Sequence, residues 1–227
     1  MRARAAVAAL LALGACGPAI TERPAPGASA PASRHSRFHR FRVEAVAAPT
    51  QIRHELALKE ISRLPGAAGS GLKTQGLTTI KHSMATHTRF STATNSSAVY
   101  AWYDDVILEV SVSSIVIHIP SEYAPGSCEY EIVLEHERGH GRAAREQAVE
   151  FAGKLERALM VSENIPTRFD PVIAPDIAAA AEQLKIAIDK VVNPVYERYE
   201  ADEKEAQAKL DRPDPYDQVY RKCSNWR

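Results

Sequence analysis

Two histidines and a glutamate in the middle of the chain have the residue types and spacing of a metal site. They are His136, Glu137 and His140, within the stretch VLEHERGHGRAARE. Residues four apart on an α-helix differ by about 40° around the axis and lie one turn apart, so both imidazoles can converge on one ion. Glu137 is rotated off that line, where its carboxylate can accept a proton from a water molecule on the metal. The spacing therefore predicts two ligands, His136 and His140, and a general base, Glu137.

The segment around these residues has the pattern of an amphipathic helix. Apolar residues recur at three- and four-residue steps from about 129 to 161, beginning with Tyr130 and ending with Leu159. Glu129 and Glu131 fall in the first turn, where the helix dipole favours acidic side chains. The metal motif is thus predicted to lie on a long helix that is either continuous or broken once.

Strands are predicted before this helix. Alternating apolar residues indicate a strand from Val106 to Val112, and a second apolar run extends from Ile115 to Ile119. The pair Ser113-Ser114 predicts either a bend between two strands or a bulge within one, and Asp104-Asp105 predicts a turn. A weaker, threonine-rich alternation from Leu72 to Thr92 predicts further strands.

Helices are predicted after the motif as well as briefly before the strands. A short helix is expected within residues 49–65, and a long one from Pro175 to Val192. Asn193-Pro194 has the character of a helix start, so a separate helix is expected from Val195 to Leu210. This order predicts an α+β fold, an antiparallel sheet followed by long helices, with H-E-x-x-H on the first long helix.

A third metal ligand has to come from elsewhere in the chain. If the two long helical segments pack as an antiparallel hairpin around a turn near residue 168, residue 136 faces roughly residue 200. This register predicts Glu200 or Glu197 as the third ligand, and Glu203 as the next choice. Glu146 follows His140 by six residues, but on an unbroken helix it points about 120° away, so it ranks low. These glutamates equally fit a solvated, charged helix face.

The N-terminal residues have the features of an export signal and a tether. Arg2 and Arg4 precede an apolar run that is too short to span a bilayer as a mature helix. Its end, Leu13-Gly14-Ala15-Cys16, resembles a bacterial lipobox, which implies a signal peptide of residues 1–15 and lipidation of Cys16. No aspartate follows Cys16, and the resemblance to Gram-negative lipoproteins then implies the periplasmic face of the outer membrane. An ordinary secretory signal is the alternative.

Residues 16–37 are rich in Pro, Ala, Gly and Ser, which predicts a flexible tether before a domain of residues 38–227. The remaining cysteines, Cys128 and Cys223, suggest one disulfide in an oxidising compartment, with two free thiols as the alternative. The formal net charge of zero argues against a nucleic-acid partner held by phosphate contacts. A membrane contact is expected through the lipid anchor only.

The motif His136-Glu137-x-x-His140, on a helix after strands, resembles the zincin metallopeptidases. A narrower resemblance is to a poorly characterised family of secreted bacterial zinc-dependent proteases. It is carried by Ile119-Pro120, by a Cys before the motif, and by the tail Asp211…Tyr220-x-x-Cys223-x-x-Trp226. These resemblances imply Zn²⁺, a peptide or protein substrate, and hydrolysis by zinc-activated water with Glu137 as base.

In zincins an edge strand above the helix holds the substrate, and Val106 to Ile119 is the expected counterpart.

Two other functions fit the same residues. One is a non-catalytic envelope lipoprotein with a structural or vestigial zinc site, and the other is a zinc amidase acting on cell-wall peptides.

Overall fold

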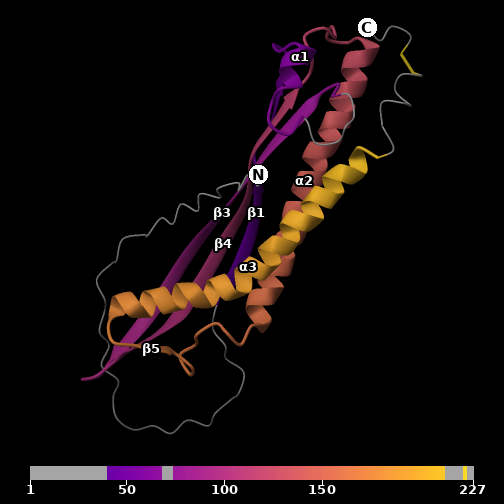
Figure 1. The fold of residues 1–227 in the computed structure, drawn as a ribbon. Coiled ribbons are helices and arrows are strands. Elements are labelled where there is room, and N and C mark those ends of the chain that lie inside the picture. Colours follow the sequence, from indigo (N-terminus) through magenta and orange to yellow (C-terminus); the bar gives the residue numbers. More distant parts are fainter. Residues whose placement is uncertain (1–39, 68–73, 213–221, 224–227) are drawn as a thin grey trace, which may run out of the picture.

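A mixed sheet covered on one face by two long helices forms the body of the protein (Figure 1). The structure, a computed structural model, describes residues 40–67, 74–212 and 222–223. The predictions for residues 1–37, including Cys16, lie outside the described residues. The elements in chain order are β1 Arg40–Ala47, β2 Thr50–Arg53, α1 Leu58–Ile61, β3 Leu77–Thr94, β4 Val99–His118, α2 Cys128–Val161, β5 Val172–Ala174 and α3 Ile177–Leu210. The α+β class predicted from the sequence is confirmed.

The sheet is mixed, so the prediction of an antiparallel sheet is wrong. β1 and β2 follow one another along one side of β4 and run parallel to it, whereas β3 and β5 pair with β4 in the antiparallel sense. The reason is the insertion of β4 between β2 and β3. The chain crosses from β2 to β3 at one end of the sheet and then returns as β4 between them, which makes β4 parallel to β2.

The central strand β4 buries one row of side chains under the helices. Val106, Leu108, Val110 and Val112 are buried, as their alternation predicts. The pairing with β3 then skips Ser113, because His82 faces Val112 and Lys81 faces Ser114. The structure therefore has a bulge within one strand rather than a bend between two, and the bulge returns Ile115 and Ile117 to the buried face.

The turn predicted at Asp104-Asp105 is absent, because both residues belong to the continuous strand β4. Asp104 is skipped in the pairing with β3, so it forms a second bulge, and it accepts a 2.7 Å hydrogen bond from the Ser91 hydroxyl. Asp105 forms an ion pair with Arg89. Partners on the neighbouring strand thus satisfy two carboxylates that the sequence alone would place in a turn.

Helix α2 is continuous from Cys128 to Val161, in close agreement with the prediction. Ser127 caps it by accepting a hydrogen bond from the Tyr130 amide at 3.2 Å. Its buried face, which includes Phe151 and Leu155, packs on the sheet and on α3. The metal motif lies in the third and fourth turns of this helix.

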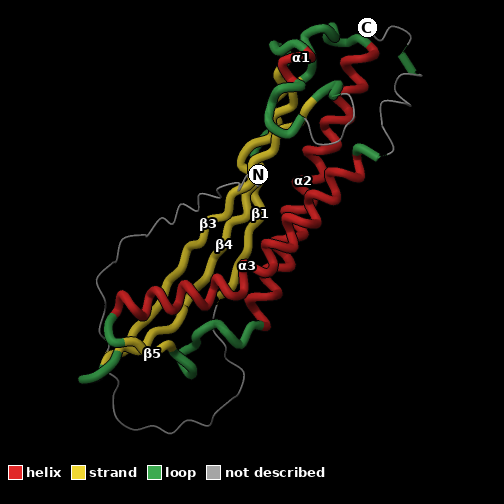
Figure 2. The backbone as a smooth tube through the Cα atoms, viewed as in Figure 1, coloured by secondary structure: helices red, strands yellow, loops and turns green. Residues whose placement is uncertain are grey.

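Helix α3 is also continuous, so the predicted break at Asn193-Pro194 is wrong. Pro194 lacks an amide hydrogen and leaves one carbonyl of the preceding turn unbonded, which bends a helix without necessarily ending it. Figure 2 shows the consequence: α3 crosses the strands with its first half and then changes direction to run along α2. Residues 49–65 likewise differ from the predicted helix, since only Leu58–Ile61 is helical and Thr50–Arg53 is a strand.

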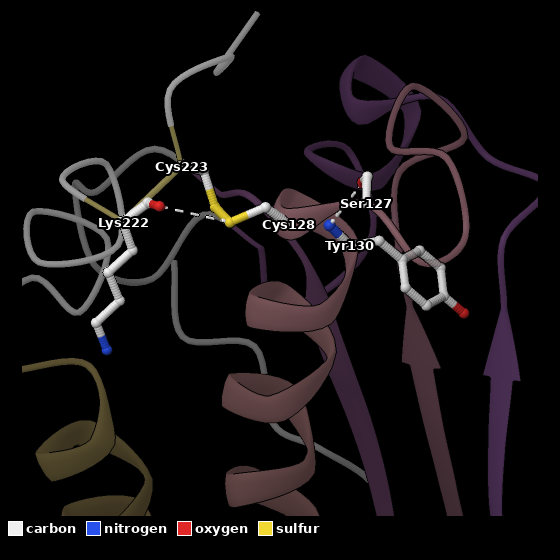
Figure 3. Close-up of a disulfide and its surroundings, with 5 residues drawn as sticks. All are labelled: Ser127, Cys128, Tyr130, Lys222 and Cys223. Carbon is white, nitrogen blue, oxygen red and sulfur yellow. Dashed lines mark hydrogen bonds between the residues drawn. A yellow bond between two sulfur atoms is a disulfide. The ribbon is translucent and has the colours of Figure 1, made fainter.

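A disulfide between Cys128 and Cys223 joins the first residue of α2 to the end of the chain (Figure 3). The two Cα atoms are 5.8 Å apart, across a sequence separation of 95. The bond holds Cys223 beside the start of the helix that carries the motif.

Candidate metal centre

The two histidines of the motif point their rings toward one another from consecutive turns of α2. The Nε2 atoms of His136 and His140 are 3.2 Å apart, and the ring planes are nearly perpendicular. Both side chains are mostly buried, with 12% of each exposed. The convergence expected from the four-residue spacing is therefore present.

Asp211 completes the group. It is the C-cap residue that directly follows α3, and its Oδ1 atom lies 3.3 Å from Nε2 of His136 and 3.2 Å from Nε2 of His140. One ligand atom from each of these three residues lies within 4.8 Å of the others. Among the described residues this is the one group of histidine, cysteine and acidic side chains that could hold a metal ion.

The glutamates predicted as third ligands lie elsewhere. Glu200 and Glu197 are exposed on α3, and Glu146 is exposed on α2. Glu203 does face the same cleft, but its carboxylate contacts His82 rather than the two histidines of the motif. None of the four belongs to the group that could hold a metal.

The register of the two long helices explains why Asp211, and not Glu200 or Glu197, lies beside the two histidines. His140 contacts Gln207 on α3, whereas a hairpin with a tight turn would place it opposite residue 196. The difference of about three helical turns is consistent with the path of α3, whose first half crosses the sheet before the helix meets α2. Glu203, Gln207 and Asp211 are spaced four residues apart, so they share one face of α3. This spacing is the sequence signal that could have pointed to Asp211.

Gln207 holds the ring of His140. The Nδ1 atom of His140 lies 2.6 Å from Oε1 of Gln207, and Nε2 of Gln207 donates to the His140 carbonyl at 3.3 Å. Since that carbonyl can only accept, the amide group must present Oε1 to the ring. Nδ1 of His140 then carries a hydrogen, so Nε2, the atom that faces Asp211, is the one that could coordinate a metal.

Glu137 is buried beside the histidines, with 3% of its surface exposed. The Thr78 hydroxyl donates to Oε2 of Glu137 at 2.7 Å and also lies 2.9 Å from the backbone carbonyl of the same residue. A Cβ atom at Gly76 would lie 2.9 Å from Oε1 of Glu137 and 2.5 Å from Cγ1 of Val133. Only glycine therefore lets the start of β3 approach the carboxylate this closely.

These residues line one cleft of about 360 Å³. Its walls are the segment before β3, the first residues of β3, the motif on α2 and the end of α3. The lining residues are Pro65–Ala67, Thr74–Ile80, His136, Glu137, His140, Glu203, Gln207 and Asp211. The prediction that Val106 to Ile119 forms the strand beside the site is wrong, because β4 is paired on both sides and β3 lines the cleft.

The charges in the cleft stabilise one another. Burial opposes a charged carboxylate, but hydrogen bonds with His136 and His140 outweigh it and hold the pKa of Asp211 far below its ordinary value. Burial alone would lower the pKa of His140, but the hydrogen bond with Asp211 and the nearby Glu137 carboxylate raise it. The carboxylate of Asp211 and the two imidazoles are thus held together by mutual hydrogen bonds.

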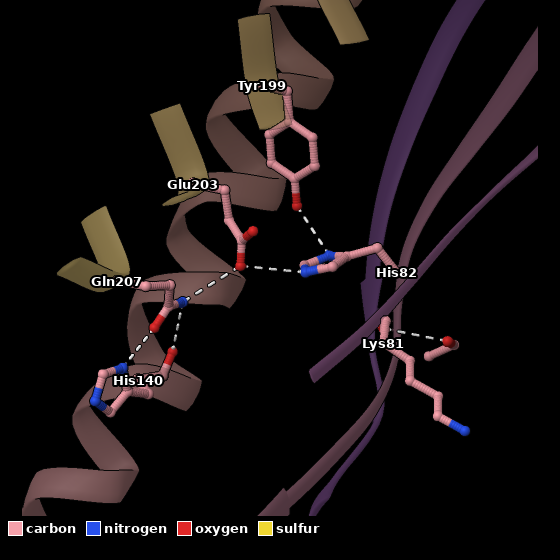
Figure 4. Close-up of polar contacts among 7 residues, drawn as sticks. Lys81, His82, His140, Tyr199, Glu203 and Gln207 are labelled. Carbon is pink, nitrogen blue, oxygen red and sulfur yellow. Dashed lines mark hydrogen bonds and ion pairs between the residues drawn. The ribbon is translucent and has the colours of Figure 1, made fainter. Parts of the chain in front are cut away.

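A chain of hydrogen bonds extends from His140 to β3 (Figure 4). Gln207 donates to Oε1 of Glu203 at 3.4 Å, and the same oxygen lies 3.3 Å from Nε2 of His82. Nδ1 of His82 lies 3.0 Å from the Tyr199 hydroxyl. No spacing connects His82 to the motif, so the sequence predicts no role for it. Its partners arise only because the bent α3 passes beside β3.

The donor set fits a metal with a preference for nitrogen and oxygen ligands. Two imidazole nitrogens and one carboxylate oxygen are the ligand types of many zinc sites, and three protein ligands leave a coordination position for water or substrate. The fold and the site together define an α+β protein with a His/His/Asp group and a buried glutamate in one cleft.

Comparisons with protein-family models, with curated proteins and with solved structures find no match to this chain. No helix within the described ranges is both long enough and apolar enough to cross a membrane.

Proposed function

We propose that this chain is a zinc-dependent metallopeptidase that hydrolyses peptide bonds in the cell envelope. The observation that carries the proposal is the presence of His136, His140 and Asp211 in the same cleft as the buried carboxylate of Glu137. Three protein ligands beside a carboxylate base match the arrangement of catalytic zinc sites, which keep one coordination position open.

A zinc ion held by His136, His140 and Asp211 would supply a Lewis acid for the substrate carbonyl and would make water a better nucleophile at neutral pH. The residues of the chain do the rest. Glu137 takes the proton from the attacking water and returns it to the leaving amine. Thr78 fixes Oε2 of Glu137, so the carboxylate is oriented before the substrate arrives. Gln207 fixes the tautomer of His140 in the same way.

Strand β3 offers a surface for the substrate. Among the described strands β3 pairs only with β4, which leaves its other edge without a strand partner. Leu77–Ile80 lie at the cleft, next to the motif. An extended peptide can bind such an edge through backbone hydrogen bonds, with its scissile bond over the metal ligands.

The envelope location is part of the same proposal. The Cys128–Cys223 disulfide supports it, since such bonds persist in oxidising compartments. The anchor is the lipidated Cys16, on the resemblance of residues 13–16 to a lipobox.

The test is cleavage of a diverse peptide mixture by the purified protein, followed by mass spectrometry. We expect cleavage that stops on chelation, returns with Zn²⁺, and is lost in Glu137→Gln while zinc binding is kept. Glu146→Gln, an exposed residue on the same helix, is the matched control and should keep full activity. Full activity of Glu137→Gln would falsify the mechanism. Zinc binding without cleavage of any peptide would support a non-catalytic envelope protein instead.

A further inference from the structure

Glu203 is a carboxylate in the cleft that the proposed hydrolysis does not use. Three carboxylates line the cleft, and no lysine or arginine is among the described residues that line it. Asp211 is paired with both histidines, and Glu137 is held by Thr78. Glu203 has its contacts with His82 and Gln207 on one carboxylate oxygen only.

The contacts of Glu203 hold its side chain in place but satisfy only one of its oxygens. Oε1 receives the contacts of His82 at 3.3 Å and Gln207 at 3.4 Å, as Figure 4 shows. Both distances are long for hydrogen bonds to a charged group. Oε2 has no hydrogen bond or ion pair from the residues that the structure describes. The side chain is only 20% exposed, so water compensates its charge less than at the surface.

The distance along α3 places Glu203 beside the path of a substrate. Glu203 precedes the ligand Asp211 by two helical turns, a rise of about 12 Å. The same cleft is lined by Ile80 of β3, the strand proposed to hold the substrate. A peptide extended along β3 advances about 3.3 Å per residue, so Glu203 meets a residue some two to four positions from the scissile bond.

We propose that Glu203 is a specificity determinant that selects substrates with a cationic group at this subsite. The inference rests on the proposed peptidase function and adds the substrate class. The cation is a lysine or arginine side chain, or the free N-terminal ammonium of a short peptide. Either group would pair with Oε2 and compensate a carboxylate that is largely removed from water.

The test is a series of peptides in which each position in turn carries lysine or the uncharged norleucine, with free or acetylated N-termini. We expect kcat/KM to be on the order of tenfold higher for lysine at one position. In Glu203→Gln this ratio should fall toward one, whereas the exposed control Glu200→Gln should keep it. A preference that disappears on acetylation instead identifies the N-terminal ammonium as the bound cation. Equal rates for all pairs in the unaltered protein overturn the inference without any variant.

Binding separates this inference from the proposed function. In Glu137→Gln, which should bind peptides without cutting them, the lysine peptide should bind about tenfold more tightly than its norleucine counterpart. Failure of the unaltered protein to cut any peptide contradicts the peptidase proposal alone, and the binding ratio then decides on Glu203. Equal dissociation constants, or the same ratio in Glu137→Gln/Glu203→Gln, overturn the role of Glu203.

Discussion

Nε2 of His140, on the first long helix, lies 3.2 Å from Oδ1 of Asp211, the C-cap residue that directly follows the second. This contact closes the candidate metal group, and it exists only because α3 continues through Pro194 to Leu210. The site is therefore a product of the packing of two whole helices rather than of the motif alone.

The first prediction concerns Asp211. Asp211→Ala should lower the affinity for Zn²⁺ by more than about 100-fold, because it removes one of three ligands, whereas loss of a supporting partner costs 10- to 100-fold. Competition with a chromophoric chelator measures the change. Glu200→Ala, an exposed glutamate on the same helix, should leave the affinity unchanged. The reverse result would restore the ligand predicted from the sequence.

The second prediction concerns the pH dependence of metal binding. The pKa of His140 is raised, mainly by Asp211 against the opposing effect of burial. A proton on His140 competes with the metal, so affinity should fall as the pH drops through this raised pKa. In Asp211→Asn the stabilising charge is gone, and the fall should move to lower pH. Chelator competition at a series of pH values checks this, and an unshifted curve would contradict it.

The third prediction concerns Gln207. Gln207→Leu keeps the size of the side chain but removes the acceptor for Nδ1 of His140, so zinc affinity should fall about 10-fold or more. Gln207→Glu keeps an acceptor and should retain or strengthen binding. Gln183→Leu, at an exposed position of α3, is the control. Equal affinities for Gln207→Leu and the unaltered protein would show that the hydrogen bond does not orient the ring.

Local patterns predicted the long helix α2 and the buried face of β4, but they misplaced the helix in residues 49–65 and the break at Pro194, and they did not give the arrangement of the elements. The period of four along α2 and the alternation along β4 each depend on one element, and both predictions are confirmed. The parallel pairing of β1 depends on where β4 inserts, and the third ligand depends on the crossing of α3 over the sheet. Neither is encoded within a short window of sequence. Asp211 belongs to the tail pattern of the narrower resemblance. Only the register of α3 against α2 brings its carboxylate to the two histidines.

The fourth prediction concerns the close approach at Gly76. In Gly76→Ala the new methyl group would collide with Val133 and with the Glu137 carboxylate, so the carboxylate must shift. We expect kcat for any cleaved peptide to fall by 10-fold or more, while zinc affinity changes little because the three ligands are untouched. Gly66→Ala is an unsuitable control, since Gly66 has a φ of 97° that favours glycine. Gly153→Ala serves as the control instead. Gly153 lies in the middle of α2 and does not line the cleft, and a Cβ atom there would lie 3.5 Å from its nearest contact, Nη1 of Arg157.

The last prediction concerns the Cys128–Cys223 disulfide. The bond spans 95 residues, so in the chain-entropy model it restricts the unfolded chain by about 4 to 5 kcal/mol. Replacing both cysteines with serine should lower the free energy of unfolding by up to about this amount, measured by urea denaturation of the metal-free protein. Zinc should raise the unfolding midpoint of both proteins, because it would bind the folded protein through His136, His140 and Asp211, none of which is replaced. A double variant that is as stable as the unaltered protein would show that the bridge closes a contact already held by packing. A double variant that folds but no longer binds zinc would show that the bridge positions Asp211 at the end of α3.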